Sequence, residues 1–450
     1  MLNDECVHPA AKTSTTPHPK FRVAICGGGI GGITLAVCLS KHPDIQVDIY
    51  EAAQSFKEVG AGVMIWGRTW QVLTLLGMDK TLRDVAGVAL DGPLVDPPFG
   101  FDFRRSDMGH DHRIYLLSMP YASNQYHRAH FLDTLLARIP ETVPHLGKRL
   151  ISYSHGDPTG SIKLKFADGT SATCDILIGC DGIKSTVRRI MFQDLADKGQ
   201  PEMIKFIEPV WTGEVVYRAL IPMEHVPLRA GQKHRVLTRS TTYCQHLTAY
   251  PIAQGKWVNF GGFVTKPEAC GTPWDKPWAA ECDAHELIEH FSGWEPEVAE
   301  ILELVQKPLR WAIFQIRPLP LFAHGTVVLL GDAAHAMTPH QGSGVGQAIE
   351  DAYVLARILG HPSTTRKNLC EALKAYEHVR LPFTNDVARQ SAEAGAVSEL
   401  RGSTGDDYAR FAHSLRGLWT WVGGEDPEAQ VQRAIKRTRH QEKVAAKALL

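Results

Sequence analysis

The sequence predicts an α/β (α+β) fold, in which a parallel sheet is joined to a second, sheet-rich domain and to a helical C-terminal region. Three observations predict this fold. An apolar strand at residues 23–26 runs directly into a glycine-rich turn and a helix. A second apolar strand at residues 326–330 ends in Gly-Asp and leads into another glycine-rich loop and helix. Alternating and β-branched segments dominate residues 205–265 between them.

The first glycine-rich turn has the spacing of a dinucleotide-binding motif. Gly27, Gly29 and Gly32 occupy the three glycine positions of GxGxxG. The first permits the tight turn, the second lets a pyrophosphate approach the backbone, and the third lets the helix pack on the strand. The following helix, from Ile30 to about Lys41, would direct its free N–H groups and its positive dipole end at the phosphates. The motif predicts a Rossmann-like nucleotide site.

A second strand at residues 47–50 strengthens this prediction because it ends in Glu51, nineteen residues after Gly32, where a ribose-binding carboxylate belongs. A glycine-rich loop beside an unrelated surface glutamate is the alternative, which the order of strand, loop, helix, strand and acid disfavours. The motif does not distinguish NAD from FAD. The small residues that follow, ending in Gly62 and Val63, favour close contact between backbone and a flat ring system.

Composition excludes several classes of function. The 450 residues include 44% hydrophobic and 22% charged residues, and the net charge of −1 offers no electrostatic footprint for nucleic acid. Nine cysteines without a CxxC pair are typical of reduced thiols. There is neither a secretion signal nor an apolar run long enough to span a membrane. We expect a cytoplasmic protein with no nucleic-acid partner.

The chain order gives the expected domains. Beyond the first motif, we predict a helix at residues 127–139 with Arg128 in its first turn, within reach of a phosphate. We predict strands at residues 148–153, 161–166, 172–178, 214–220, 235–238, 246–251 and 256–264. The predicted domains are a disordered lead-in at residues 1–19, a discontinuous nucleotide-binding domain at residues 20–90, 127–200 and 320–370, a substrate-binding β-sheet domain at residues 91–126 and 201–319, and a helical region at residues 371–450.

Two further motifs follow apolar strands. Asp181-Gly182 is followed by Ser185 and Arg188, and Gly331-Asp332-Ala333-Ala334-His335 is followed by Pro339 and Gly342. With the first motif and Glu51, this ordered set resembles the single-component FAD-dependent aromatic hydroxylases, the group that includes 4-hydroxybenzoate and salicylate hydroxylases. The strongest resemblance is to fungal salicylate-hydroxylase-like enzymes, over about residues 20–395. One departure is the segment at residues 65–70, which replaces the Pro-Asn commonly found there.

The resemblance implies a fold of the 4-hydroxybenzoate hydroxylase type with FAD as the cofactor and NADH or NADPH as a transient electron donor. It implies hydroxylation of a phenolic substrate of the hydroxybenzoate or salicylate type by molecular oxygen, through a flavin C4a-hydroperoxide, with or without oxidative decarboxylation. Asp181 belongs to the motif implicated in use of FAD and the nicotinamide cofactor. Asp332 would contact the ribityl and pyrophosphate region, and Gly344 and Val345 could offer N–H groups to the pyrimidine side of the flavin.

Three residues are candidates for substrate binding. Arg218 lies on a predicted strand and could hold a phenolate or carboxylate. His246 and Tyr250 share one face of another strand, and a histidine is suited to taking up a phenol proton near neutral pH. Each of these could instead be an ordinary core or surface residue. The 21 histidines form no compact ligand motif, so we predict no metal.

Several alternatives remain open at this point. The same fold could support a dearomatising phenol hydroxylase or an isoprenoid epoxidase. A non-catalytic binding protein on the FAD fold is a more remote alternative, and a plain NAD-dependent dehydrogenase would not explain Gly331-Asp332 and the following loop. The sequence leaves the substrate, the choice of NADH or NADPH, and a monomer or homodimer undecided.

Overall fold

The computed structural model describes residues 18–56, 62–86, 100–108, 112–119, 121, 123–156, 160–227, 239–242, 245–253, 255–401 and 407–448. The predicted lead-in up to residue 17, the predicted strand at residues 235–238 and residues 60–61 lie outside the described residues.

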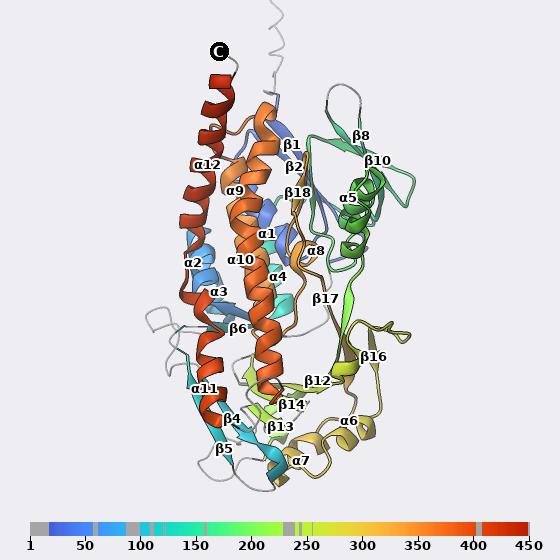
Figure 1. Ribbon diagram of the computed structural model, residues 1–450, viewed down its shortest axis with the longest axis vertical. Helices are drawn as coiled ribbons and strands as arrows, with labels where there is room; N and C mark the ends of the chain where they lie inside the picture. The colour runs from blue at the N-terminus through green and yellow to red at the C-terminus, as the bar shows by residue number, and fades with distance from the viewer. Residues whose placement is uncertain are drawn as a thin grey trace, which may run out of the picture.

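A six-stranded sheet carries the nucleotide-binding motifs (Figure 1). In spatial order its strands are β18 (Ala323–His324), β19 (Val327–Leu329), β11 (Ile176–Gly179), β1 (Phe21–Cys26), β2 (Ile45–Tyr50) and β7 (Pro144–His145). All neighbouring pairs are parallel except β18 with β19. The central strands are almost entirely apolar and buried, as is typical of a parallel sheet covered on both faces. Their carboxyl ends therefore lie together at one edge.

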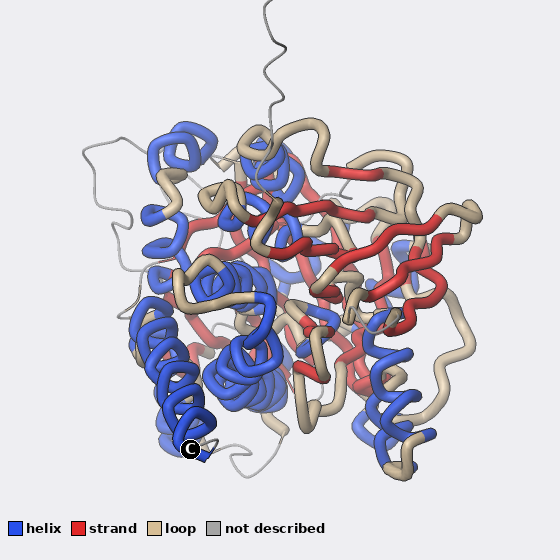
Figure 2. The backbone as a smooth tube through the Cα atoms, turned by 90° about the horizontal axis from the view of Figure 1, so that it is seen from above, coloured by secondary structure: helices blue, strands red, loops and turns tan. Residues whose placement is uncertain are grey.

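Helices and a smaller sheet cover this sheet. Figure 1 shows α9 (Gly344–Leu359), α10 (Leu369–Ser398) and α12 (Pro427–Ala448) on one side, and α5 (Thr186–Asp197) with β8 (Leu150–His155) and β10 (Ser171–Cys174) on the other. Figure 2 shows from above that the helix at the C-terminal end lies among other helices beside the strands. The remaining helices of this part are α1 (Ile30–Leu39), α2 (Gly67–Leu75), α3 (Asp79–Ala86), α4 (Arg128–Leu136) and the short α8 (Asp332–His335).

The predicted single strand at residues 172–178 is wrong. The segment forms β10 (Ser171–Cys174), which pairs with β9 (Ile162–Phe166) and through it with β8 (Leu150–His155), and then β11 in the six-stranded sheet. Asp175 lies at the junction, where its carboxylate accepts hydrogen bonds from the backbone N–H of Arg22 at 2.8 Å and from its guanidinium at 3.0 Å. These bonds stabilise the bend at which the chain passes from one sheet to the other.

An eight-stranded sheet forms the second part of the molecule. In spatial order its strands are β16 (Ala279–Glu281), β17 (Leu309–Gln315), β12 (Val210–Pro222), β15 (Trp257–Thr265), β14 (Gln245–Ile252), β13 (Arg239–Thr242), β4 (Gly100–Arg105) and β5 (Arg113–Ser118). Helices α6 (Ala284–His290) and α7 (Pro296–Glu303) pack against it through a separate apolar core that includes Tyr217, Leu287 and Phe291. Strands β4 and β5 join from far earlier in the chain.

Strand register places certain side chains in rows across this sheet. In the antiparallel pairing of β12, β15 and β14, Arg218 lies opposite Gly261, which lies opposite Thr248. Residues opposite one another share a face of the sheet, and that face alternates along each strand. His246 and Tyr250, two residues to either side of Thr248, therefore lie on the same face as Arg218.

The 30-residue helix α10 connects the two parts and continues into α11 (Tyr408–Gly417) and α12. Near its middle, Arg380 is fully buried and donates to Asp351 Oδ1 at 2.6 Å and to Gln347 Oε1 at 2.7 Å, both on α9, and to Gln430 Oε1 at 2.8 Å. Asp351 also accepts from the backbone N–H of Gly331 at 3.1 Å. Burial raises the pKa of Asp351, but the charges of His335 and Arg380 outweigh it and lower the pKa to about 2.

This network makes a testable prediction for stability. The substitution Arg380→Met leaves Asp351 buried without its cation, and loss of one partner from a buried ion pair costs about 3–5 kcal/mol. We expect the free energy of unfolding, measured by urea titration, to fall by about that amount. Arg389→Met on the same helix is the matched control, because its bonds to Asp386 and Glu393 are exposed and should contribute less than about 1 kcal/mol. Equal stability of the two variants would contradict the prediction.

Candidate active site

The turn after β1 brings backbone close to backbone in the way the glycine spacing predicts. Gly27 has a φ of +111°, and a Cβ there would overlap the carbonyl group of Cys180 at the end of β11. A Cβ at Gly32 would overlap the carbonyl oxygen of Gly27. In contrast, a Cβ at Gly29 would meet no atom within 4 Å among the described residues, so open space lies in front of the N-terminus of α1. This opening could admit a pyrophosphate.

Glu51 lies beside the same turn. Its Oε2 accepts a hydrogen bond from the backbone N–H of Gly28 at 2.6 Å, and its Oε1 accepts one from Ala53 at 2.7 Å. The carboxylate is half-exposed, and each oxygen keeps a second lone pair. Glu51 therefore stabilises the turn and remains able to accept a bond from a ribose hydroxyl.

The side chains of the second motif bond to other groups of the protein. The carboxylate of Asp181 accepts hydrogen bonds from the Ser185 hydroxyl and from the backbone N–H groups of Thr186 and Val187, so it caps the start of α5. Arg188 is buried and donates to three backbone carbonyls, those of Ile183, Ile207 and Ala333. These side chains fix the position of the segment that follows β11.

The third motif presents a carboxylate to an open space. Gly331, with a φ of +62°, turns the chain after β19, and Asp332 is exposed at the start of α8. Among the described residues, no hydrogen-bond partner or ion pair is found for the Asp332 carboxylate. Helix α9 begins at Gly344, and a Cβ at Gly344 would lie 4.0 Å from Asp332 Oδ1. The N-terminus of α9 and the free carboxylate thus lie at one place.

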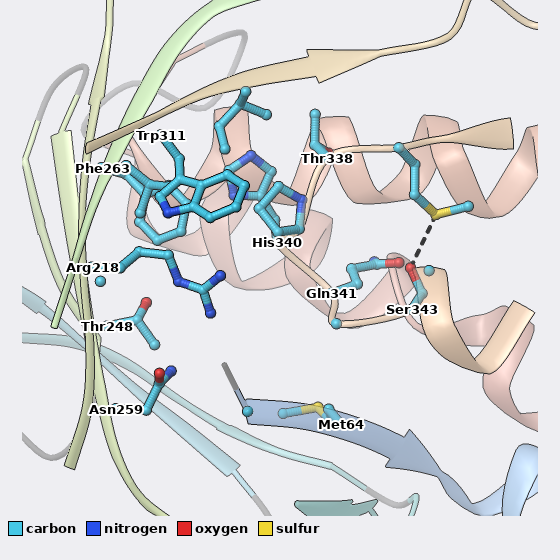
Figure 3. Close-up of a pocket in the computed structure, with 18 of the residues that line it drawn as sticks. Met64, Arg218, Thr248, Asn259, Phe263, Trp311, Thr338, His340, Gln341 and Ser343 are labelled. Atoms are coloured by element: carbon cyan, nitrogen blue, oxygen red, sulfur yellow. Dashed lines mark hydrogen bonds between the residues drawn. The ribbon is translucent and has the colours of Figure 1, made fainter. Parts of the chain in front are cut away.

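A cavity of about 420 Å³ lies between the eight-stranded sheet and the loop at residues 337–345 (Figure 3). The predicted site residues that line it are Gly62, Val63, Arg128, Arg218, His246, Tyr250, Asp332, Gly344 and Val345. Of the other predicted residues, Gly27, Gly29, Glu51 and Asp181 follow the ends of β1, β2 and β11, and Gly32 lies in the first turn of α1. The structure therefore places the predicted substrate residues and part of the predicted cofactor residues in one cavity.

Arg218 extends from β12 into this cavity (Figure 3). The side chain is mostly buried, and no carboxylate pairs with it in the described part of the chain. Burial and the nearby charge of Arg128 lower the pKa of Arg218, while Tyr250 acts in the opposite direction. A largely desolvated guanidinium without a counter-ion favours an anion in the cavity.

Tyr250 lies where the eight-stranded sheet approaches Gly62. Its hydroxyl oxygen would be 3.6 Å from a Cβ at Gly62, on β3 (Gly62–Trp66), which pairs with β6 (Ser123–His127) just before Arg128. The predicted flat-ring contact segment and the predicted substrate residue Tyr250 are therefore neighbours. Asn259, opposite Tyr250 on β15, also lines the cavity.

His246 lies in a buried group of acids and histidines behind the cavity wall. Its Nδ1 is 3.0 Å from Glu399 Oε1, and its ring stacks on Phe263 at a centroid distance of 4.2 Å. The His340 ring lies 5.4 Å from the Phe263 ring and 5.5 Å from the His246 ring between centroids, and His340 Nε2 is 3.1 Å from Glu214 Oε2. Neither Glu214 nor Glu399 is predicted from the sequence. Glu214 could have been identified from the sequence, because it lies four residues before Arg218 on the same face of one strand. No local sequence pattern indicated Glu399, which is 153 residues from His246.

In the part of the chain that the structure describes, no helix combines the length and apolar character needed to cross a bilayer.

Comparisons with known proteins agree with this arrangement. Residues 303–391 match the family model described as an FAD binding domain. A salicylate hydroxylase of Pseudomonas putida is 35% identical over 432 residues, covering 93% of this chain and 95% of its own. A 6-methylsalicylate 1-monooxygenase of Aspergillus terreus is 36% identical over 431 residues, covering 92% of each chain.

A solved structure described as a salicylate hydroxylase substrate complex superposes with a TM-score of 0.80 at 29% identity, covering 93% of this chain and 98% of that one. Each of these three matches covers more than nine-tenths of the chain. Together with the glycine turns and the shared cavity, they show that the chain belongs to the family of FAD-dependent aromatic hydroxylases that includes the salicylate hydroxylases.

Proposed function

We propose that the protein hydroxylates a phenol of the salicylate type, using NADH or NADPH and molecular oxygen, and that Arg218 binds the anionic group of this substrate. The observation that carries the proposal is the mostly buried Arg218, which has no carboxylate partner among the described residues and points into the cavity that Asp332 and the start of α9 also line. The two relatives named for salicylates support this choice of substrate class.

The residues of the two glycine turns fit FAD. The open space at Gly29 and the N-terminus of α1 suit the pyrophosphate, and Glu51 suits the ribose. The free carboxylate of Asp332 suits the ribityl hydroxyls, and the N–H groups of Gly344 and Val345 suit the ring. When bound, FAD supplies the electron transfer and oxygen activation that no side chain here can supply.

The protein's own contribution is to bind and orient the ring. The fork of Arg218 can donate two parallel hydrogen bonds to a carboxylate, or bind a phenolate. Phe263 and Trp311 provide flat apolar surfaces beside it (Figure 3). Tyr250 places a hydroxyl near the backbone of Gly62, so the substrate ring is held between the sheet and the cofactor side. These apolar walls exclude water from the reacting face.

The reaction has two balanced forms. In simple hydroxylation, one oxygen atom enters the ring, a ring hydrogen is lost, and the second oxygen atom leaves as water with two electrons from NAD(P)H. In decarboxylative hydroxylation, the oxygen enters at the carbon that carries the carboxyl group, which leaves as carbon dioxide. Both begin from an electron-rich phenolate, so Arg218 serves either outcome.

The experiment that tests this function is NAD(P)H oxidation by the FAD-loaded protein across a panel of hydroxybenzoates and alkylated phenols, with product masses read in parallel. We expect salicylates to stimulate oxidation and to gain one oxygen. Carboxyl retention would identify simple hydroxylation, and loss of carbon dioxide would identify the decarboxylative form. Failure of every phenol to stimulate oxidation would overturn the proposal.

Arg218→Met tests the anion-binding role. Loss of charge-assisted hydrogen bonds costs about 1.5–3 kcal/mol, so we expect the substrate dissociation constant to rise about 10- to 100-fold, measured by flavin absorbance titration. FAD content should not change. Arg218→Lys keeps the charge but loses the fork and should give an intermediate constant. Unchanged substrate affinity in Arg218→Met would remove this residue from the proposal.

Asp332→Ala tests the cofactor role. Because this carboxylate has no partner among the described residues, its removal should leave the thermal stability of the FAD-free protein unchanged, yet raise the FAD dissociation constant about tenfold or more. Asp181→Ala is the contrasting variant, because it removes the cap of α5 and should cost the FAD-free protein about 1 kcal/mol. If Asp332→Ala instead bound FAD as tightly as the wild type, its assignment would be wrong.

A further inference from the structure

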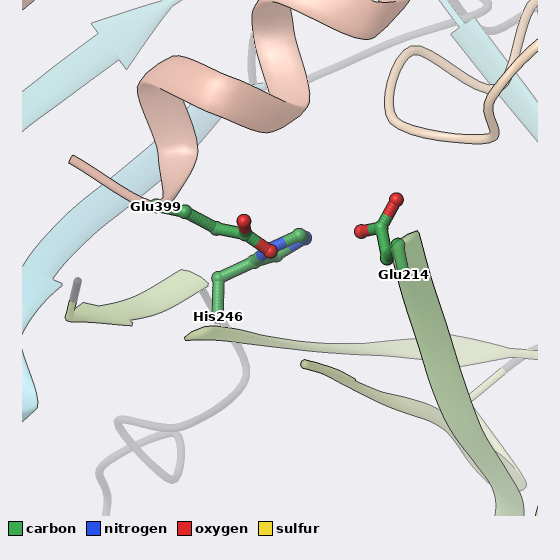
Figure 4. Close-up of side chains that lie close together, drawn as sticks. All are labelled: Glu214, His246 and Glu399. Atoms are coloured by element: carbon green, nitrogen blue, oxygen red, sulfur yellow. The ribbon is translucent and has the colours of Figure 1, made fainter. Parts of the chain in front are cut away.

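Behind the cavity wall lies a buried cluster of ionisable groups contributed by four elements, and Figure 4 shows three of its members, Glu214, His246 and Glu399. We define this acid–histidine cluster as Glu214 on β12, His246 on β14, His340 in the loop after α8, and Glu399 and Arg401 at the end of α10. His246 and His340 line the cavity, whereas Glu214 and Glu399 do not. The histidines therefore stand between the cavity and the carboxylates.

One half of the cluster has balanced charge. Glu399 accepts from Arg401 Nε at 2.7 Å, from the Thr265 hydroxyl at 3.0 Å and from His246 Nδ1 at 3.0 Å. Burial raises the pKa of Glu399, but His246 and Arg401 outweigh it and lower the pKa to about 2. Glu399 is therefore a carboxylate paired with Arg401, and His246 donates to it.

The other half has an uncompensated charge. Glu214 Oε2 bonds to His340 Nε2, while Glu214 Oε1 and His340 Nδ1 are buried with no partner among the described residues. If Nε2 carries the proton of a neutral imidazole, this pair has a net charge of −1 in an apolar setting. Burial raises the pKa of Glu214, with Glu399 adding to the rise and His340 and Arg401 opposing it. Uptake of one proton would make the pair neutral.

The cavity contains the opposite unpaired charge, which is positive. Arg218, two strand rows from Glu214 on the same face of β12, is a mostly buried cation without a carboxylate partner among the described residues. The carboxylate of a salicylate balances Arg218, so one negative charge then remains unpaired, on Glu214. Transfer of the phenolic proton to Glu214 would make the Glu214–His340 pair neutral and would place that charge on the phenolate, beside Arg218 and the nearby charge of Arg128. Charges in low-dielectric surroundings are costly unless paired, so this transfer is favoured.

We propose that Glu214, reached through His340, is the acceptor of the substrate's phenolic proton. The O–H bond of the phenol breaks as an N–H bond forms at His340 Nδ1, and the proton on Nε2 passes to Glu214 Oε2. No electrons change carriers in this step. The inference rests on the proposed function, which supplies the phenol, and it makes His340 a relay and Glu214 the group that stores the proton.

A metal ion is the competing occupant. One ligand atom each from Glu214, His246 and Glu399 lies within 4.8 Å of the others. However, the Glu399 carboxylate already bonds to Arg401, Thr265 and His246, so a cation would have to displace these donors. A divalent ion would also leave the cluster with a net positive charge, because only one negative charge is unpaired. A proton balances the cluster without breaking a bond.

The test follows the proton directly in the FAD-loaded protein. A nitrosalicylate, whose phenolate is seen in difference spectra, is titrated into weakly buffered protein that contains a pH indicator. In the wild type we expect the ligand to bind as the phenolate with almost no proton released, because the proton stays on Glu214. In Glu214→Gln, which cannot accept a proton, phenolate should form only with release of about one proton. The apparent pKa of the bound phenol should then be at least one unit higher, a tenfold weaker ionisation.

Two variants accompany this one. Glu295→Gln is the matched control, because Glu295 is equally buried but bonds to Arg104 and Ser106 and does not line the cavity; it should behave as the wild type. His340→Asn interrupts the relay while keeping Glu214, and it should shift the bound phenol's pKa in the same direction. If Glu214→Gln does not fold, His340→Asn tests the proposal in its place.

The outcomes that overturn the inference are distinct. If the nitrosalicylate binds and Glu214→Gln and His340→Asn match the wild type in proton release and bound pKa, the inference is wrong and the proposed function stands. If no phenol binds the wild type, the proposed function falls and the inference falls with it. If the purified protein contains one divalent metal ion that Glu214→Gln loses, the cluster is a metal site and stores no proton.

Discussion

The position of the cofactor side depends on one buried carboxylate. Asp351, on α9, accepts hydrogen bonds from the backbone of Gly331, from His335 and from Arg380 on α10. It therefore ties the turn that presents Asp332 to α9 and to α10. Because both charges of the Asp351–Arg380 pair are fully buried, neither can be satisfied by water if the other is removed. The Asp351–Arg380 pair therefore helps to fix the position of the Asp332 carboxylate at the cavity.

Helix α10 connects this buried ion pair to the eight-stranded sheet. Arg380 in its middle bonds to the nucleotide-binding part, and Glu399 just after its last turn bonds to His246 on the substrate sheet. At about 1.5 Å per residue, the 19 residues between them span roughly 28 Å. A single rigid element thus sets the spacing between the wall that faces the cofactor and the wall that faces the substrate.

Local sequence predicted the glycine turns, because their motifs are short. The roles of Gly27 and Gly29 follow from spacing along a few residues, and the turns formed where the spacing predicts them. The substrate side was predictable only in part: alternation placed His246 and Tyr250 on one face, but strand register was needed to bring them into line with Arg218. Glu399 could not be predicted from the sequence, because its contact with His246 depends on where the long helix α10 ends in space. The error at residues 172–178 has the same cause, because hydrogen bonds to Asp175 from a distant strand decide where the sheet changes.

The two walls of the cavity differ in whether backbone or side chains form them. The cofactor wall is largely backbone, formed by glycine turns and helix ends, whereas the substrate wall consists of side chains that alternate along paired strands. Single-nucleotide changes in a gene alter side chains far more readily than they alter the path of a backbone. Substitutions at positions such as Thr248 and Asn259 therefore leave the path of the glycine turns unchanged, so this scaffold can acquire a differently shaped cavity while it keeps the backbone of its nucleotide-binding turns.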